Sequence, residues 1–187
     1  MGRIVYFTGG ARSGKSLQAE KYIFDKEYTQ KIYLATSIPF DDEMKARVKK
    51  HKEQRGENWI TIEGYSNLIE KISPYAERDG VILLDCLTNM VTNLMIMDRE
   101  CDWDNISTDE VDRIELEIKD EVESFFEYVK NQKIDVVVVS NELGMGVVPA
   151  YPLGRYFRDI CGRMNQIAGT YADEAYMAVS GLQLKLK

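Results

Sequence analysis

Cysteine and histidine are scarce in this sequence of 187 residues, which has three cysteines and one histidine. The cysteines, Cys86, Cys101 and Cys161, are dispersed and form no C-x-x-C pair. An odd number of scattered cysteines is typical of a reducing compartment and argues against a disulfide framework. Because the single histidine is far from every cysteine along the chain, the ligand pattern of a structural zinc site is missing as well.

Long apolar runs and an excess of basic residues are also missing. No apolar stretch reaches the length of a transmembrane helix, and the chain shows no signal peptide or lipidation motif. Asp and Glu outnumber Lys and Arg by 31 to 24, and the resulting net charge of −7 argues against a dedicated nucleic-acid or anionic-membrane binder. We therefore expect a soluble, cytoplasmic protein that has no transmembrane segment and binds no nucleic acid.

The length and composition predict one globular domain over residues 1–187. Hydrophobic residues make up 44% and charged residues 29%, which are ordinary values for a chain that buries a core. No internal repeat, low-complexity tract or linker divides the sequence.

Short β-branched runs alternate with longer segments of helical periodicity. The runs that predict strands are Arg3–Thr8, Lys31–Thr36, Val81–Asp85, Val136–Ser140 and Tyr176–Ser180. Two of these runs are apolar at nearly every position, as in strands that helices cover on both faces of a parallel sheet. The alternation predicts an α/β fold with a mostly parallel sheet, helices on both faces and right-handed crossovers.

Two helices are predicted from their apolar spacing. Over Thr108–Lys130, apolar residues recur at steps of three and four, and Ser107 followed by Glu110 is a capping-box start. The second helix is predicted over Arg155–Tyr171.

A phosphate-binding motif follows the first predicted strand. The pattern G-x-x-x-x-G-K-[ST] is matched by Gly9, Gly10, Ala11, Arg12, Ser13, Gly14, Lys15 and Ser16. The glycines let the loop wrap around phosphates with its N–H groups inward, and the following helix adds its dipole. Lys15 is predicted to reach the β/γ-phosphates, and Ser16 to bind Mg²⁺. The strand–loop–helix context argues against a chance match.

Asp85 is the best candidate for the acidic residue that holds Mg²⁺ through water in P-loop proteins, because it ends the apolar run Val81–Leu84. The alternative is an aspartate that serves only the turn after the strand. An N-K-x-D motif for guanine recognition is absent, which argues against a switch GTPase of the Ras type.

His51 is the only histidine, and it lies in a basic segment of this acidic chain. Between Lys45 and Arg55 there are six basic residues and one acidic residue. Such cations keep an imidazole neutral and nucleophilic near neutral pH, and they attract a polyphosphate. This combination suits attack on phosphorus. Spacing alone leaves two other interpretations open: a solvated basic helix, or a histidine on a packed helix face.

The sequence resembles the bifunctional adenosylcobinamide kinase/adenosylcobinamide-phosphate guanylyltransferase family of cobalamin biosynthesis over its whole length. The residues that carry the resemblance are Thr8–Ser16, Ala35–Ser37, Asp41–Met44, Arg47, Val48, His51, Lys52, Arg55, Trp59, Glu63, Asp85–Thr88, Asn93, Leu94, Ser140–Pro149, Phe157–Asp159, Gly162, Arg163, Asn165, Gln166, Ala172–Glu174 and Val179–Gly181. A P-loop alone is common, but this set in this order is specific.

The resemblance implies a RecA-like P-loop NTPase fold, assembly as a homotrimer and two reactions. ATP or GTP phosphorylates adenosylcobinamide, and GMP from GTP then passes through a histidine–GMP intermediate to adenosylcobinamide phosphate. His51 occupies the position of that histidine. The same alignment places Gly9–Ser16, Ala35, Thr36, Ser37, Lys52, Glu53, Gln54, Arg55, Glu63 and Asp85 on nucleotide-contacting positions. Mg²⁺ is implied at Ser16 and Asp85, and the corrinoid is substrate rather than cofactor.

Two other functions compete with this interpretation. In a monofunctional P-loop small-molecule kinase, His51 is structural and forms no adduct with GMP. A non-catalytic nucleotide-binding regulator binds nucleotide and releases no pyrophosphate.

Overall fold

The structure of this chain, a computed structural model, describes residues 1–37, 59–97 and 99–187. His51 and the predicted nucleotide contacts Lys52, Glu53, Gln54 and Arg55 lie outside the described residues. The strands are β1 Ile4–Gly9, β2 Lys31–Ala35, β3 Trp59–Glu63, β4 Gly80–Asp85, β5 Ile134–Asn141, β6 Glu174–Val179 and β7 Leu182–Lys185. The helices are α1 Lys15–Asp25, α3 Leu68–Ala76, α4 Leu87–Ile96, α5 Thr108–Lys130 and α6 Pro152–Tyr171.

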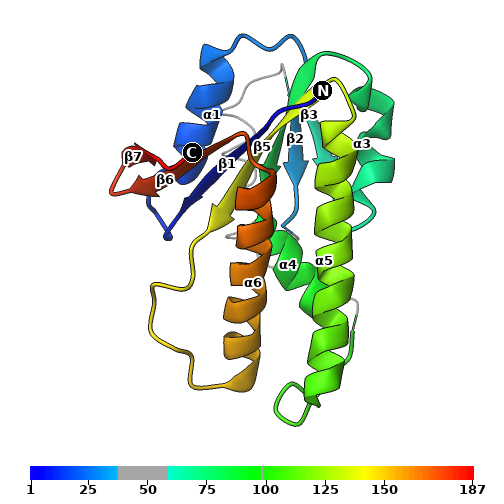
Figure 1. The fold of residues 1–187 in the computed structure, drawn as a ribbon, viewed down its shortest axis with the longest axis vertical. Coiled ribbons are helices and arrows are strands. Elements are labelled where there is room, and N and C mark those ends of the chain that lie inside the picture. The colour runs from blue at the N-terminus through cyan, green and yellow to red at the C-terminus, as the bar shows by residue number, and fades with distance from the viewer. Residues whose placement is uncertain (38–58, 98) are drawn as a thin grey trace.

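The described strands form one sheet of seven in the order β3-β2-β4-β5-β1-β6-β7 (Figure 1). All neighbouring pairs are parallel except β6 and β7, which are antiparallel. The carboxyl ends of the parallel strands therefore share one edge, called the carboxyl edge below. The α/β fold with a mostly parallel sheet is confirmed.

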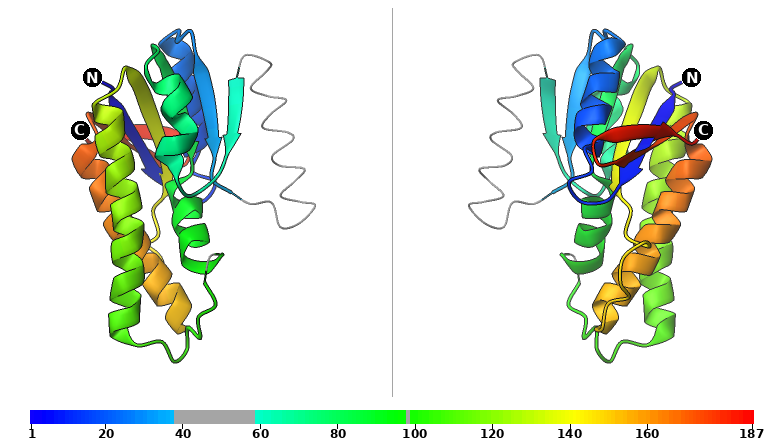
Figure 2. Two further views of the ribbon diagram at one scale, coloured as in Figure 1. Left: turned by 90° about the vertical axis from the view of Figure 1, so that its right-hand side faces the viewer. Right: turned by 90° about the vertical axis from the view of Figure 1, so that its left-hand side faces the viewer.

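Helices lie on both faces of the sheet (Figure 2), and an apolar cluster packs between the sheet and the helices on each face. Val136 and Val138 pack in the cluster under α3, α4, α5 and α6, whereas Val137 and Val139 pack in the cluster under α1. Every one of these valines is fully buried, which confirms the prediction from the continuous apolar run. The helices α5 and α6 extend beyond the carboxyl edge (Figure 1).

The predicted strands correspond to β1, β2, β4, β5 and β6, with small shifts in their ends. Two strands were missed, β3 and β7, and both lie at the sheet's outer edges. The side chains of β7 are all exposed and those of β3 are exposed or half-buried, so neither strand carries a buried apolar run. Helix α6 begins three residues before its predicted start because Pro152 suits the first helical turn.

Helix α5 has the bounds that its periodicity predicts, and its apolar positions are buried. Its start is capped as expected, because the Ser107 hydroxyl accepts a hydrogen bond from the Glu110 N–H at 3.2 Å. Among the described helices, none is both long and apolar enough to cross a membrane.

We expect Ser107→Ala to lower the free energy of unfolding by about 1 kcal/mol, because it leaves an N–H of the first turn without its capping acceptor. Ser107→Asp is the matched control and should retain stability, since its carboxylate accepts the same bond near the positive end of the helix dipole. Urea denaturation measures both variants. Equal losses in the two would contradict a capping role.

Candidate functional site

The predicted phosphate loop connects β1 to α1 at the carboxyl edge of the sheet (Figure 1). Gly10, Ala11 and Arg12 are exposed, whereas Ser13 and Lys15 are buried. The loop thus presents its tip to solvent and keeps its ammonium group inside. The predicted strand–loop–helix arrangement is confirmed.

Two glycines are required by the path of the loop. Gly14 has φ +93°, a conformation that favours glycine, and it immediately precedes α1. At Gly9, an added Cβ would stand 2.4 Å from the backbone oxygen of Ala178 on β6. The loop therefore approaches the neighbouring strand closely, backbone against backbone.

Lys15 lies inside the loop. Its Nζ donates to the Gly10 carbonyl at 3.2 Å, and the residue is 8% exposed. Burial lowers the pKa of Lys15, and the nearby Cys86 and Asp85 partly offset that lowering. The ammonium is thus held inside the loop on a backbone carbonyl, a position from which it can move to a phosphate ligand.

Asp85 lies at the carboxyl end of β4, and β5 separates that strand from β1. The Tyr33 hydroxyl donates to Asp85 Oδ2 at 3.2 Å. Asp85 is also near enough to Lys15 to raise its pKa, so the structure brings these two predicted residues together. Asp85 and Ser16 offer carboxylate and hydroxyl oxygens, the hard donors that Mg²⁺ prefers, and this donor set fits the ion.

Thr36 joins the ends of β2 and β4 in a way that its sequence position did not reveal. Its Oγ1 donates to the Cys86 carbonyl at 2.7 Å and accepts from the Cys86 N–H at 2.8 Å. Asn93 Nδ2 on α4 donates to the Thr36 carbonyl at 2.6 Å. The Thr36 side chain is almost fully buried, so it holds the strand end that carries Asp85.

A second polar network was also missed. Ser140 on β5 shares a hydrogen bond with Thr88 at 3.0 Å and donates to Asn165 Oδ1 on α6 at 2.6 Å. Thr88 accepts from the Asn141 N–H at 2.7 Å, and Asn165 donates to the Asn141 carbonyl at 3.0 Å. The sequence did carry a signal for this network: Ser140 and Asn141 are polar residues that directly follow a buried apolar run. Buried polar groups need hydrogen-bond partners.

Glu63 ends β3, far along the same edge. Four strand spacings separate β3 from β1, which at about 4.8 Å per strand amounts to roughly 19 Å. Ala35 and Ser37 lie between them, at the end of β2.

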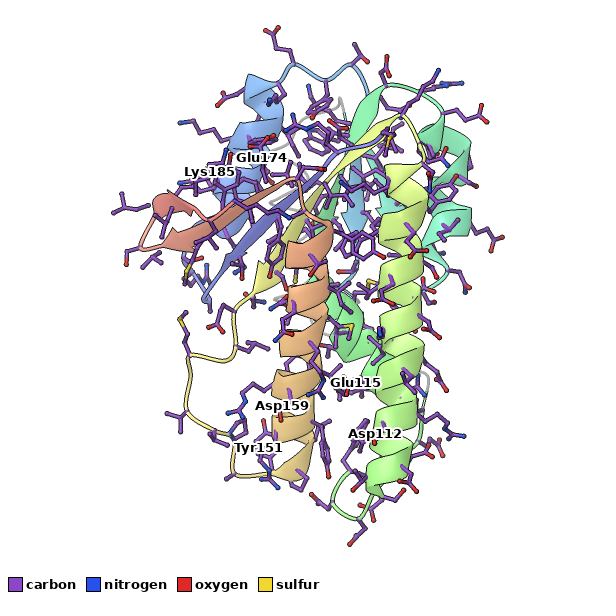
Figure 3. All side chains as sticks on the ribbon, in the orientation of Figure 1. Asp112, Glu115, Tyr151, Asp159, Glu174 and Lys185 are labelled. Carbon is purple, nitrogen blue, oxygen red and sulfur yellow. The ribbon has the colours of Figure 1, made fainter. Side chains whose placement is uncertain are left out.

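A groove lies elsewhere on the molecule, away from the phosphate loop. It has a volume of about 570 Å³, runs between α5 and α6 and includes Asp112, Glu115 and Arg163 in its lining. Figure 3 shows Asp112 and Glu115 on α5, beside α6. None of the predicted site residues lines this groove. We therefore assign the site from the phosphate loop and its neighbours, not from the size of the groove.

Comparison with known proteins adds three findings. A family model described as cobinamide kinase/cobinamide phosphate guanyltransferase matches residues 5–186. The bifunctional adenosylcobalamin biosynthesis proteins CobU of Escherichia coli (strain K12) and Salmonella typhimurium are each 42% identical over 188 residues, covering 98% of this chain and 99% of theirs. An ATPase from the type III secretion system of pathogenic bacteria has a TM-score of 0.54 at 10% identity, covering 95% of this chain and 51% of that one. The last likeness shows the fold alone.

We expect Thr36→Val to destabilise the protein by about 1–3 kcal/mol, because the buried Cys86 N–H loses its acceptor, while the Cys86 carbonyl keeps only the bond from the Met90 N–H. Thr61→Val on β3 is the matched control, since Thr61 is exposed and surface changes cost at most about 0.5 kcal/mol. Urea denaturation compares the two variants. A Thr36→Val protein as stable as wild type would show that the hydroxyl bridge is dispensable.

Proposed function

The chain belongs to the cobinamide kinase/cobinamide phosphate guanyltransferase family, and we propose how its residues carry the two reactions. It is an enzyme with cobinamide kinase and cobinamide phosphate guanylyltransferase activity. The observation that supports our assignment best is the phosphate loop with buried Lys15, placed beside Asp85 at the carboxyl edge. The acceptor of the first reaction is adenosylcobinamide, ATP or GTP is the donor, and the second reaction uses GTP.

In the kinase step, the loop N–H groups and Lys15 bind the β- and γ-phosphates. The acceptor hydroxyl oxygen bonds to the γ-phosphorus, and the bond from that phosphorus to the β–γ bridging oxygen breaks. The nucleoside diphosphate leaves, and the hydroxyl proton passes to solvent. Lys15 leaves the Gly10 carbonyl for the phosphates and stabilises the charge that develops on them. The acceptor leaves as adenosylcobinamide phosphate.

In the guanylyltransferase step, a ring nitrogen of His51 bonds to the α-phosphorus of GTP, and pyrophosphate leaves. A phosphate oxygen of adenosylcobinamide phosphate then bonds to the same phosphorus, and the P–N bond breaks. This frees His51 and gives adenosylcobinamide-GDP. The single histidine and its basic neighbours in the sequence support this role.

One nucleotide lying along the carboxyl edge satisfies the remaining predicted contacts. Its phosphates occupy the loop, while Ala35–Ser37 and Glu63 contact the end nearer the nucleobase. The distance between β1 and β3 supports an extended nucleotide. Lys52, Glu53, Gln54 and Arg55 are proposed contacts from the sequence alone.

Mg²⁺ is the proposed metal, with Ser16 as a direct ligand and Asp85 acting through water. When bound, Mg²⁺ neutralises charge on the phosphates. Asp85 keeps its orientation through the Tyr33 hydroxyl and through the Thr36 bridge to Cys86.

We also propose that the enzyme is a cytoplasmic homotrimer. The family resemblance supports the trimer. The three cysteines, which are free in the structure, support a reducing compartment.

His51→Asn should abolish guanylyl transfer and leave the kinase reaction in place, because direct transfer to a hydroxyl needs no protein nucleophile. With [α-³²P]GTP, wild type should retain acid-labile label on the protein and the variant none. Phosphorylation of adenosylcobinamide by [γ-³²P]ATP is the internal control for folding. A His51→Asn protein that still carries GMP would contradict the assignment and leave the kinase-only function open.

Asp85→Asn should reduce Mg²⁺-dependent turnover more than Mg²⁺-free nucleotide binding, since the amide keeps the shape of the carboxylate but loses its charge. The Mg²⁺ concentration for half-maximal rate should rise at least tenfold, the usual scale for losing a residue that orients a metal's ligands. Titration of the kinase rate with Mg²⁺ measures this. An unchanged titration curve would reduce Asp85 to a residue of the strand end.

A further inference from the structure

The hairpin of β6 and β7 ends in a two-residue turn that touches the phosphate loop. Ser180 and Gly181 have φ of 52° and 82°, the left-handed values of a tight hairpin turn, and Val179 pairs with Leu182 across it. Figure 2 shows this hairpin lying beside α1.

Both backbone polar groups of Gly181, its N–H and its carbonyl, form hydrogen bonds with the phosphate loop or with α1. The Gly181 N–H donates to the Ser13 carbonyl at 2.9 Å. Gln18 Nε2, on the first turn of α1, donates to the Gly181 carbonyl at 2.9 Å. The turn is therefore tied to both the loop and the helix that follows it.

The bond to Ser13 orients a group inside the loop. In a trans peptide the carbonyl and the following N–H point in opposite directions. Because the Ser13 carbonyl faces outward to Gly181, the N–H of Gly14 faces the other way, into the loop. The turn thus helps to determine the direction of one donor that a phosphate needs.

The contact is close and leaves little room for adjustment. A Cβ on Gly14 would stand 3.3 Å from Gly181 Cα. By contrast, β7 buries none of its four residues, so the strand adds little to the apolar core. The core contacts of the hairpin come from β6, where Ala175, Tyr176 and Ala178 are buried, whereas the turn beyond β6 contacts the loop.

We propose that the Ser180–Gly181 turn, locked by Gln18, is a positioning element that holds the phosphate loop in its binding conformation. This rests on the proposed function, in which the loop binds the nucleotide phosphates. The turn acts through Ser13 and Gly14 and touches no reacting atom. Breaking the contacts of this turn should weaken the binding of GTP and of inorganic triphosphate by the same factor, because both ligands make the same phosphate contacts. The fold should stay in place.

The test compares Gln18→Ala with Leu17→Ala, at a neighbouring position on α1 whose side chain is exposed and cannot form the hydrogen bond to Gly181. Calorimetry measures the Kd of GTP and of inorganic triphosphate, and urea denaturation is run on the same samples. Gln18→Ala should raise both Kd values by the same factor, about two- to tenfold, the range for one hydrogen bond. It should also raise the nucleotide KM more than it changes kcat, and Leu17→Ala should change neither Kd.

A second pair of variants addresses the turn itself. Gly181→Asn keeps the N–H and tolerates a positive φ, so it should bind triphosphate like wild type, whereas the β-branched Gly181→Val should bind more weakly. Unchanged triphosphate affinity in both Gln18→Ala and Gly181→Val would overturn the proposal, as would a loss of folding stability with no loss of affinity.

Lys15→Ala separates this proposal from the function on which it rests. If wild type and Lys15→Ala bind triphosphate equally, the phosphate site is wrongly assigned. If Lys15→Ala loses binding while Gln18→Ala and Gly181→Val keep it, only the positioning role fails.

Discussion

The site depends on one constraint: a phosphate loop binds its ligand only if it can turn N–H groups inward, so the carbonyls of Gly9 and Ser13 must be held from outside. Two backbone donors do this. The Glu142 N–H, just after β5, bonds to the Gly9 carbonyl, and the Gly181 N–H bonds to the Ser13 carbonyl. Both are available because β1 lies between β5 and β6 in the sheet. Strand order therefore determines the shape of the loop.

The carboxyl edge of the sheet also brings charged groups close to one another. Lys15 is buried, and Asp85 ends a nearby strand and is close enough to raise the pKa of Lys15, so a cation and a carboxylate share the proposed phosphate and metal site. The hydroxyl of Thr36 and the amide of Asn93 fix the backbone around Asp85 with bonds that are out of reach of water. Such buried, fully paired groups are costly to disturb, which makes the edge rigid. A rigid frame suits chemistry that works by positioning and charge stabilisation.

Much of this could be predicted from local sequence. The apolar runs at Val81–Leu84 and Val136–Val139 identified the central strands, and the glycine-lysine pattern identified the loop. The edge strands β3 and β7 could not be predicted, because their residues are exposed or half-buried and form no continuous apolar run. The bonds from Thr36 to Cys86 and from Gly181 to Ser13 join residues far apart in sequence, and no local pattern encodes such contacts. The predicted roles of His51 and its neighbours stay predictions, since those residues lie outside the part of the chain that the structure describes.

The role of the loop can be seen in a crystal structure with a non-hydrolysable GTP analogue and Mg²⁺. We expect the β-phosphate inside the loop, within hydrogen-bond reach of the Gly14 N–H, with Lys15 Nζ moved from the Gly10 carbonyl to the phosphates. The bonds from Glu142 and Gly181 to the outer carbonyls should remain. A nucleotide bound elsewhere, with Lys15 still on Gly10, would show that the loop is not the phosphate site.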